Sequence, residues 1–356
     1  MRNISLIAIL VFTSVMAVAC DDLLQQFPRD CSLQDRLRSV KAALKSKGVD
    51  ADEVAEYRVL RFVDRYSWEK AKTARTAPDN IYNPAPATWE VWDAGMRQIF
   101  ANPDIHMTDA DFSAMNRVLL TNGSDNIKDP NTDRTKKPGE FRTGNDLGIG
   151  FCHANVKDSN PILEKSSRSN MIFQNRWEQK TGMNFKQLMK ENGALAPESA
   201  SLQAKMTQSE NPNCQAPNSW VNFIPTREVQ QQLSWLRVFT ETNLQLIRDG
   251  RAAASPIELA AFVQRWFVTI HPFSDGNGRT SRAVQDVLLA GFAMPFAPAG
   301  DLYNDATTEW ESYLEQTYKT MESMLTVLEN CASEDYAKPV GARPFQCGTV
   351  AELNRL

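Results

Sequence analysis

The stretch HPFSDGNGRTSR, residues His271 to Arg282, decides the fold of this chain because it joins two strongly patterned helices. On its N-terminal side, Ser255 suits an N-cap and Pro256 a first helical turn, and apolar residues then recur at helical spacing up to Ile270. A second helix is predicted to begin near Gly276-Asn277. The apolar stripe of the first helix is wide enough for a central, buried helix. The stretch is therefore predicted to be the elbow between two core helices.

The second half of the elbow has the composition of an anion-binding site. A helix N-terminus preceded by Gly276, Asn277 and Gly278 offers unpaired N–H groups and the positive end of the helix dipole to phosphate oxygens. Glycine lets a ligand approach the backbone closely. Arg279 and Arg282 are three residues apart, so both are predicted to face one side of the first turn and to bind further phosphate oxygens.

The first half of the elbow adds an acid and a base. Asp275 would repel a bare phosphate, so its presence predicts a divalent cation, Mg²⁺ by preference, between this carboxylate and a nucleotide. His271 has a side chain whose ordinary pKa of about 6.5 suits a general base. Each of these residues alone has an ordinary structural explanation, but the combination indicates phosphoryl or nucleotidyl transfer.

The overall composition is that of a folded protein. The 356 residues are 42% hydrophobic and 23% charged, which is close to globular averages and argues against a disordered chain. The formal net charge is −4, whereas nucleic-acid-binding proteins usually carry a basic excess. We therefore expect no nucleic acid among the partners.

Residues 1–19 have the pattern of a secretory signal peptide. Arg2 supplies the basic start, an apolar run follows from Ile4 to Val18, and Ala17 and Ala19 have the spacing of a cleavage site. The sequence therefore predicts an exported protein, secreted or periplasmic. A lipoprotein anchored to a membrane through Cys20 is the alternative, although the leucine usual three residues before such a cysteine is missing.

Cysteine usage agrees with export. The even number of cysteines allows disulfides in an oxidising compartment, and lipidation of the first would leave one of the other five unpaired. The sequence does not choose the pairs. The six are Cys20, Cys31, Cys152, Cys214, Cys331 and Cys347.

Beyond the leader, the chain divides into three parts. Residues 20–85 are predicted to form an N-terminal helical region, with helical spacing from Leu33 to Tyr66, and a connector rich in proline and asparagine from Thr76 to Thr88. The main domain is predicted over residues 86–335. Residues 336–356 are predicted to be a C-terminal tail.

Within the main domain, helices dominate the predicted elements. Thr108 begins a helix with a capping-box pattern, and another helix runs from Thr226 to Arg248. Residues 140–151 are predicted to form a short hairpin, and residues 161–217 an insertion over the core, with one amphipathic helix near Phe185 to Lys190. The fold class is therefore predicted to be all-α, a helical bundle with one short β-hairpin.

The elbow resembles the Fic domain signature, HxFx(D/E)GNGRxxR, at every specified position. The resemblance extends over about Trp89 to Leu328, with the predicted insertion set aside. Lys137 to Arg142 (KPGEFR) resembles the lead into the β-hairpin flap of that family, and Ile224-Pro225 resembles the segment two helices before the signature. The resemblance implies an all-α Fic fold with a hairpin flap, preceded here by the N-terminal helical extension.

By the same resemblance, the chain is expected to be a protein adenylyltransferase that moves AMP from ATP to a Ser, Thr or Tyr hydroxyl of a target protein. His271 would deprotonate the hydroxyl and Asp275 would hold Mg²⁺. Gly276, Asn277, Gly278, Arg279 and Arg282 would bind the nucleotide phosphates. The flap residues Phe141, Arg142, Thr143, Gly144 and Asn145 would hold the target segment by strand addition.

Two alternatives stay open. The signature fixes the diphosphate more firmly than the base or the leaving group, so transfer of UMP, phosphate or phosphocholine is the alternative within the fold. A non-catalytic nucleotide-binding or scaffold protein is the alternative outside it, and the intact His271 and Asp275 argue against that reading.

Regulation and ATP supply are further open points. Many Fic proteins carry an inhibitory (S/T)xxxE(G/N) helix, but Gln187, Met206 and Leu325 stand where the Ser or Thr would precede the three Glu-Asn pairs. Restraint is then absent, differently built, or supplied by a separate inhibitor protein. ATP is scarce outside cells, so an exported enzyme needs another supply of it. Delivery of an effector into another cell would provide ATP, and so would a lumen that receives it.

Overall fold

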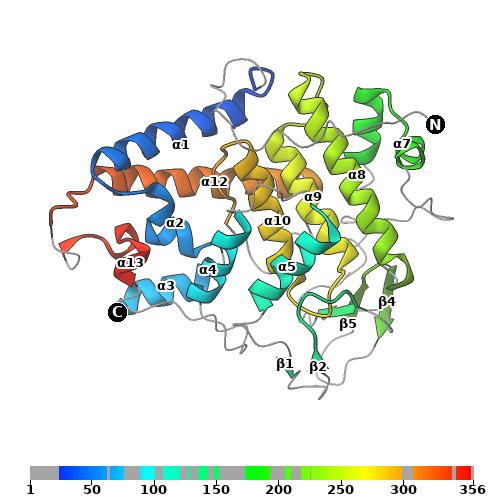
Figure 1. Ribbon diagram of the computed structural model, residues 1–356, viewed down its shortest axis with the longest axis horizontal. Helices are drawn as coiled ribbons and strands as arrows, with labels where there is room; N and C mark the ends of the chain where they lie inside the picture. The colour runs from blue at the N-terminus through cyan, green and yellow to red at the C-terminus, as the bar shows by residue number, and fades with distance from the viewer. Residues whose placement is uncertain are drawn as a thin grey trace, which may run out of the picture.

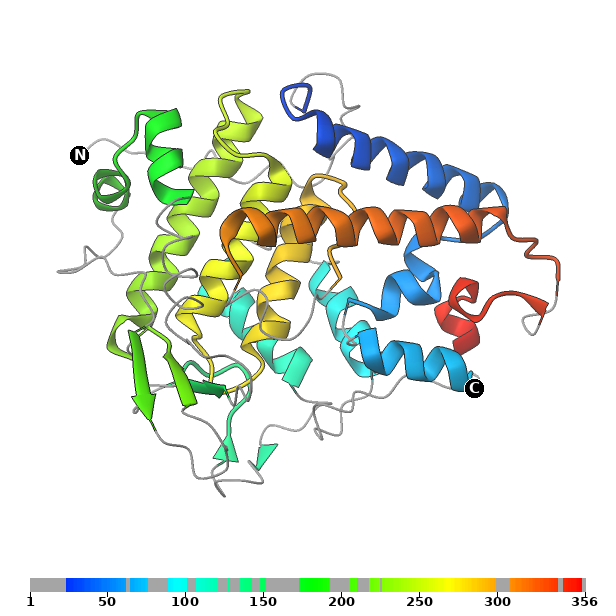
Figure 2. The same ribbon diagram turned by 180° about the vertical axis from the view of Figure 1, so that it is seen from behind.

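The protein is described by a computed structural model, and Figures 1 and 2 show its two faces. Helices make up most of the regular structure, which confirms the predicted fold class. The structure describes residues 24–61, 65–75, 89–100, 107–120, 127–128, 135–142, 148–151, 173–192, 205–209, 218–224, 226–298, 308–338 and 342–353.

Helix α9 (Pro256–Ile270) is the centre of the bundle. All of its residues except Glu258 are buried, and it packs against α8 (Val229–Arg248), α10 (Asn277–Gly291) and α12 (Trp310–Ser333). Its start is the predicted one, because Ser255 Oγ accepts a hydrogen bond from Glu258 N at 3.1 Å. A helix buried on all sides gives the elbow at its C-terminal end a rigid base.

The N-terminal region shares the core of the main domain. Helix α1 (Pro28–Ser46) lies along α12, side by side with it in both views (Figures 1 and 2). Its Asp30 is almost fully buried and accepts hydrogen bonds from Ile257 N at 3.0 Å and from Tyr318 Oη at 2.5 Å. Because Ile257 is in the first turn of α9, the carboxylate of Asp30 satisfies one of the N–H groups that open this central helix.

The remaining N-terminal elements are short. They are η1 (Ala51–Glu53), α2 (Ala55–Val59), α3 (Arg65–Ala74) and α4 (Trp89–Phe100), which leads to α5 (Asp109–Leu120). The predicted capping box at the start of α5 is present, since Thr108 N donates to Asp111 Oδ2 at 2.9 Å and Asp111 N to Thr108 Oγ1 at 3.3 Å. Helix α5 packs against α10 and brings its last turns to the elbow.

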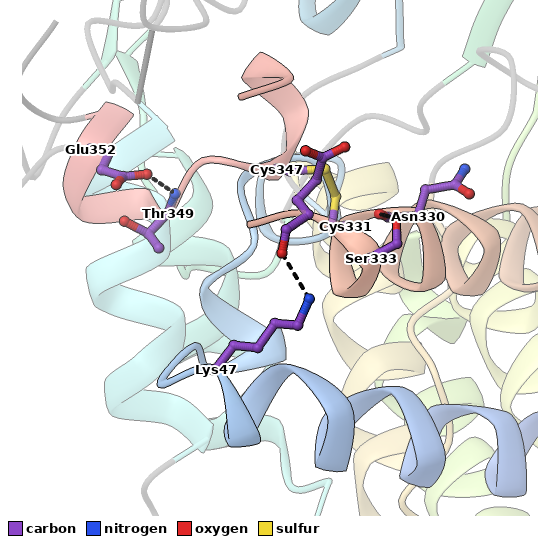
Figure 3. The surroundings of a disulfide bond; sticks show 8 residues. Lys47, Asn330, Cys331, Ser333, Cys347, Thr349 and Glu352 are labelled. Atoms are coloured by element: carbon purple, nitrogen blue, oxygen red, sulfur yellow. Dashed lines mark hydrogen bonds between the residues drawn. A yellow bond between two sulfur atoms is a disulfide. The ribbon is translucent and has the colours of Figure 1, made fainter. Parts of the chain in front are cut away.

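A disulfide ties the C-terminal segment to α12. Cys331 and Cys347 are bonded across 16 residues (Figure 3), a loop for which a cross-link typically stabilises a fold by about 3 kcal/mol. Cys347 lies in η4 (Phe345–Cys347), and α13 (Val350–Leu353) follows. Cys31 is disulfide-bonded as well. These bonds match the predicted use of cysteine.

Residues 143–147 of the expected hairpin at 140–151 lie outside the described residues, and the described residues on either side of them pair elsewhere. Strand β3 (Gly148–Phe151) pairs antiparallel with β5 (Asn218–Asn222), some seventy residues further on, and β5 pairs with β4 (Lys205–Ser209). Phe141 makes an isolated bridge with Phe273 in the elbow instead. Periodicity shows a strand but not its partner, so the sequence could not reveal this long-range pairing. A separate two-stranded ladder joins β1 (Ile127–Lys128) to β2 (Thr135–Lys136).

Part of the predicted insertion contributes to the core. Residues 173–181 form a helix that precedes α7 (Phe185–Glu191), and the apolar side chains of both pack against α8 and α9. Trp177 is buried, with its indole N–H donating to Asn243 Oδ1 at 2.7 Å, and the Phe173 ring stacks on Phe262 at 3.9 Å. None of the helices in the described ranges combines the length and the apolar character that a membrane crossing requires.

Candidate active site

The elbow lies at the end of the bundle where the three-stranded sheet is found (Figures 1 and 2). Its first residue, His271, ends α9 in the left-handed conformation with φ of +51°, which is costly for a residue other than glycine. This conformation turns the chain sharply out of the helix while the amide N–H of His271 still bonds to Phe267 O at 3.0 Å. The side chain of His271 is half-buried at this turn.

Two contacts orient the imidazole of His271. Its ring is stacked on Phe223, with 3.6 Å between ring centroids and 10° between planes. Its Nδ1 lies 3.2 Å from Val268 O. Because a carbonyl oxygen can only accept, Nδ1 carries the proton, and Nε2 of the neutral ring is then the nitrogen with a lone pair. A histidine in this tautomer can take up a proton at Nε2.

The surroundings keep His271 neutral. Burial lowers the pKa of its imidazole to about 3, and the nearby charge of Arg142 acts in the same direction, while the bond to Val268 O and the charge of Asp275 oppose it. A neutral imidazole at physiological pH is the form that a general base requires.

This pKa has a measurable consequence for stability. The folded-state pKa is below the ordinary value of about 6.5, so the unfolded chain binds more protons between the two values and His271 destabilises the fold as pH falls. Between pH 7.5 and pH 5, the free energy of unfolding should fall by about 2 kcal/mol more in the wild type than in His271→Asn. Asparagine tolerates the left-handed conformation and does not titrate. Urea unfolding of both proteins at the two pH values measures the difference, and equal acid sensitivity would contradict a depressed pKa.

The turn after His271 is built around a clasp made by Asn277. This side chain is buried, donates to Phe273 O at 2.8 Å and accepts from Phe273 N at 2.9 Å. Its amide is therefore used to close the loop, and the part of Asn277 that could bind a ligand is its backbone N–H in the first turn of α10. Phe273 itself is buried and stacks on Phe141 with ring centroids 5.0 Å apart.

The two glycines of the turn differ in what they permit. Gly276 is the N-cap of α10 with φ of +76°, and a Cβ there would lie 2.9 Å from Asn116 Nδ2. Gly278 has an ordinary helical conformation, and the nearest atom to a Cβ would be Arg282 Nη1 at 3.5 Å. The first glycine is thus required by the fold. Gly278 instead leaves room for the side chain of Arg282, which lies beside it in the first turn of the helix.

The two arginines flank the N-terminus of α10. Arg279 Nη1 donates to Leu119 O at 2.6 Å, which fixes that guanidinium against the end of α5. Burial lowers the pKa of Arg279 to about 10. The charge of Asp275 opposes this shift, the charge of Arg282 adds to it, and the group stays protonated at neutral pH. The charges of Asp275 and Arg282 both act on Arg279 at this helix end, where the helix dipole favours a bound anion.

Asp275 completes the elbow. Its Oδ1 accepts from Gly276 N at 2.6 Å, one of the several hydrogen bonds that the two oxygens of a carboxylate can accept. In the part of the chain that the structure describes, no three His, Cys, Asp or Glu side chains gather as a metal-binding cluster. A cation at Asp275 would therefore take most of its ligands from phosphate and water, the usual manner for Mg²⁺. The half-buried carboxylate fits that role.

The structure describes only the beginning of the expected target-binding flap. Phe141 is bridged and stacked to Phe273, and Arg142 is buried with its guanidinium directed at the backbone of the elbow. The side chain of Arg142 therefore faces the interior, where a target segment does not reach it. Thr143, Gly144 and Asn145 lie outside the described residues.

Two residues of the site escaped the sequence reasoning. Asn116 in α5 is fully buried, donates to Asp275 O at 2.9 Å and to Thr280 Oγ1 at 3.1 Å, and accepts from Gly139 N at 2.9 Å. Phe223 follows β5 and covers the imidazole. A polar residue on the apolar face of α5 was the only available signal for Asn116, and Phe223 gave none.

Part of the chain, which includes the elbow, matches a known protein family. Residues 201–289 match the model of the Fic/DOC family. A Fido domain-containing protein from Dictyostelium discoideum is 32% identical over 84 residues, which are 22% of this chain and 59% of that protein. The chain thus spans less than two thirds of this relative.

Among solved structures, a Fic domain containing signaling protein from Bacteroides thetaiotaomicron is 12% identical with a TM-score of 0.43, over 87% of this chain and 99% of that one. A Fic family protein from Desulfovibrio desulfuricans is 13% identical with a TM-score of 0.35, over 88% and 70%. The resemblance of the elbow to the Fic signature is confirmed by the family match, because residues 201–289, which match the Fic/DOC family model, include the whole stretch from His271 to Arg282.

Proposed function

We propose that this protein is a protein adenylyltransferase, which moves AMP from ATP to a hydroxyl of a target protein. Members of the Fic family typically transfer phosphate-containing groups, and residues 201–289 match that family. The observation that supports the proposal most directly is the state of His271. Its imidazole is neutral, its Nδ1 proton is used by Val268 O, and it stands at the same turn as the N-terminus of α10.

In the proposed reaction, His271 Nε2 takes the proton of a Ser, Thr or Tyr hydroxyl of the target. The hydroxyl oxygen forms a bond to the α-phosphorus of ATP, and the bond from that phosphorus to the oxygen bridging to the β-phosphate breaks. The products are the AMP ester of the target and pyrophosphate. Placing the base and the phosphates on one short turn reduces the entropy cost of bringing them together.

The phosphates are assigned to the N-terminus of α10. Backbone N–H groups at Gly276, Asn277 and Gly278 would donate to their oxygens, and Arg279 and Arg282 would offset the charge that develops on the leaving pyrophosphate. Mg²⁺ held by Asp275 would neutralise further charge on the phosphates when it is bound.

We assign the target segment to the backbone of the flap, residues 141–145, since the side chain of Arg142 faces the interior. Phe141 already pairs with Phe273 through the backbone, so a segment that adds alongside it would place a hydroxyl near His271. Strand addition uses main-chain hydrogen bonds, so recognition here would depend little on the sequence of the target.

We further propose that the protein acts after export. The signal-like residues 1–19 support this, and so does the Cys331–Cys347 disulfide, because such bonds persist in oxidising compartments. Delivery into another cell would bring the enzyme to ATP.

The test is label transfer from nucleotides to protein. Purified oxidised protein is incubated with Mg²⁺ and α-labelled ATP, GTP, CTP or UTP, or γ-labelled ATP, and self-modification is read by intact mass. Transfer from α-labelled ATP, with an added mass of one AMP and loss of signal in EDTA, is expected. Transfer from γ-labelled ATP or from UTP alone would replace AMP transfer by phosphate or UMP transfer. Nucleotide binding without any transfer would indicate a non-catalytic protein.

A further inference from the structure

We propose that Arg142 is a positioning residue of this site, which sets the backbone conformation and the tautomer of His271. The catalytic part of this inference rests on the proposed function, because it takes His271 to be the general base. It rests on the contacts of one buried guanidinium that lies outside the elbow in sequence.

Arg142 holds the two peptide groups on either side of the His271 Cα atom. Its Nε donates to His271 O at 2.7 Å, and its Nη2 lies 3.3 Å from Ile270 O. Its backbone N–H donates to Pro272 O at 2.8 Å. The φ and ψ angles of a residue describe how the peptide groups before and after it are oriented. By holding both groups, these bonds stabilise the left-handed conformation of His271, which costs about 1 kcal/mol on its own.

The position also suits a positive charge. The carbonyl groups at the end of α9 carry the negative end of the helix dipole, and a cation there is favourable. The left-handed turn at His271 breaks the helix, so these carbonyl oxygens have no intrahelical partner beyond it. The planar guanidinium, which has five donors in a fixed fork, can serve several carbonyl groups at once, whereas a lysine ammonium cannot reproduce that geometry.

The other side of the same guanidinium holds the segment that carries Phe223. Nη2 donates to Ile224 O, and Nη1 donates to Thr226 Oγ1 at 2.6 Å. Phe223 is the ring that stacks on His271. One buried side chain therefore connects the backbone of the base to the segment that covers its ring. Loss of the Arg142 guanidinium, with its fork of hydrogen bonds, is expected to release both the backbone of His271 and the segment that carries Phe223.

The direction of the electrostatic effect agrees with this geometry. The charge of Arg142 is among the factors that lower the pKa of His271. Without the fork, the imidazole should reach solvent more freely, its pKa should rise toward about 6.5, and the Nε2–H tautomer should become populated. The Nε2–H form has no lone pair at the nitrogen that faces the substrate.

The experiment uses the full chain labelled with ¹⁵N-histidine. The chain has only three histidines, so the NMR signals of His271 are assigned as those that disappear in His271→Asn. In the wild type, the His271 signals should show the Nδ1–H tautomer and should not titrate between pH 5 and 8. In Arg142→Lys, they should show a mixed tautomer and titrate within that range. AMP transfer should lose about 10- to 100-fold in kcat, less than the about 10²- to 10⁴-fold expected when a general base is removed outright, because Arg142 acts through His271. The KM for ATP should change less than about threefold.

A matched control separates positioning from general stability. Arg343 is also buried and donates to Glu352 Oε1 at 2.7 Å, in the C-terminal segment. Arg343→Lys should lower the melting temperature as Arg142→Lys does, but it should leave the His271 spectrum and kcat unchanged. If Arg142→Lys does not fold, Thr226→Val removes one acceptor of the fork while conserving shape, and the same change in tautomer is expected to a smaller extent.

The outcomes distinguish the two proposals. A folded Arg142→Lys protein with a wild-type His271 spectrum would overturn the role of Arg142, whatever the activity. Absence of label transfer in the wild type, together with the expected change in the spectrum, would reject the proposed function and leave the positioning role in place.

Discussion

Replacement of His271 by alanine is expected to lower kcat for AMP transfer by about 10²- to 10⁴-fold, the range attributed to a positioned general base. The reason is the neutral imidazole with its proton on Nδ1, which is the group at the elbow prepared to accept a proton. The affinity for ATP should change less than about threefold, because the phosphates are assigned to α10 and not to this side chain. Single-turnover transfer from α-labelled ATP and calorimetric binding measure the two quantities separately.

The other two histidines of the chain, His106 and His153, supply the matched controls. Alanine at either position should leave transfer within about twofold of the wild type, as expected for residues without a role in proton transfer. A His271→Ala protein that is folded, binds ATP and still transfers AMP at the wild-type rate would reject His271 as the base. Loss of ATP binding together with activity would show instead that the substitution had disturbed the turn.

The helices around the site could be predicted because their signals are local. Ser255 as a cap, Pro256 in the first turn and apolar residues at helical spacing specify α9 without any knowledge of the rest of the chain. The start of α10 at Asn277 follows from the glycine before it, which takes the left-handed conformation. Local propensity and tertiary packing agree here, so the sequence was sufficient.

The hydrogen bonds that hold the site in place could not be predicted, because they join residues that are distant in sequence. Arg142 and His271 are 129 residues apart, and Asn116 and Asp275 are 159 apart. Nothing in a single sequence shows that a guanidinium assigned to target binding turns inward to the end of α9. The resemblance identified the residues at the turn, but the geometry assigns the side chains of Asn277 and Arg142 to holding the turn rather than to touching a ligand.

Replacement of Gly276 by alanine is expected to lower the free energy of unfolding by about 2–4 kcal/mol and to weaken ATP binding more than tenfold. About 1 kcal/mol comes from the left-handed backbone, with φ of +76°. The rest comes from overpacking, since the new Cβ would lie 2.9 Å from Asn116 Nδ2 and 3.2 Å from Leu120 Cδ1. Asn116 cannot move aside without losing its bonds to Asp275 and Gly139, so the strain passes directly to the turn.

Gly48 offers a control with the same backbone conformation and a different environment. Its φ is also +76°, but a Cβ there would meet nothing within 4 Å. Gly48→Ala should therefore cost only the backbone term of about 1 kcal/mol and should leave ATP binding unchanged. Urea unfolding and calorimetry on both variants separate the two contributions. If the two substitutions lower the free energy of unfolding equally, the contact with Asn116 does not constrain the turn. If Gly276→Ala costs more and also weakens ATP binding, the packing of α5 against Gly276 holds the backbone N–H groups of α10 in the geometry that the phosphates need.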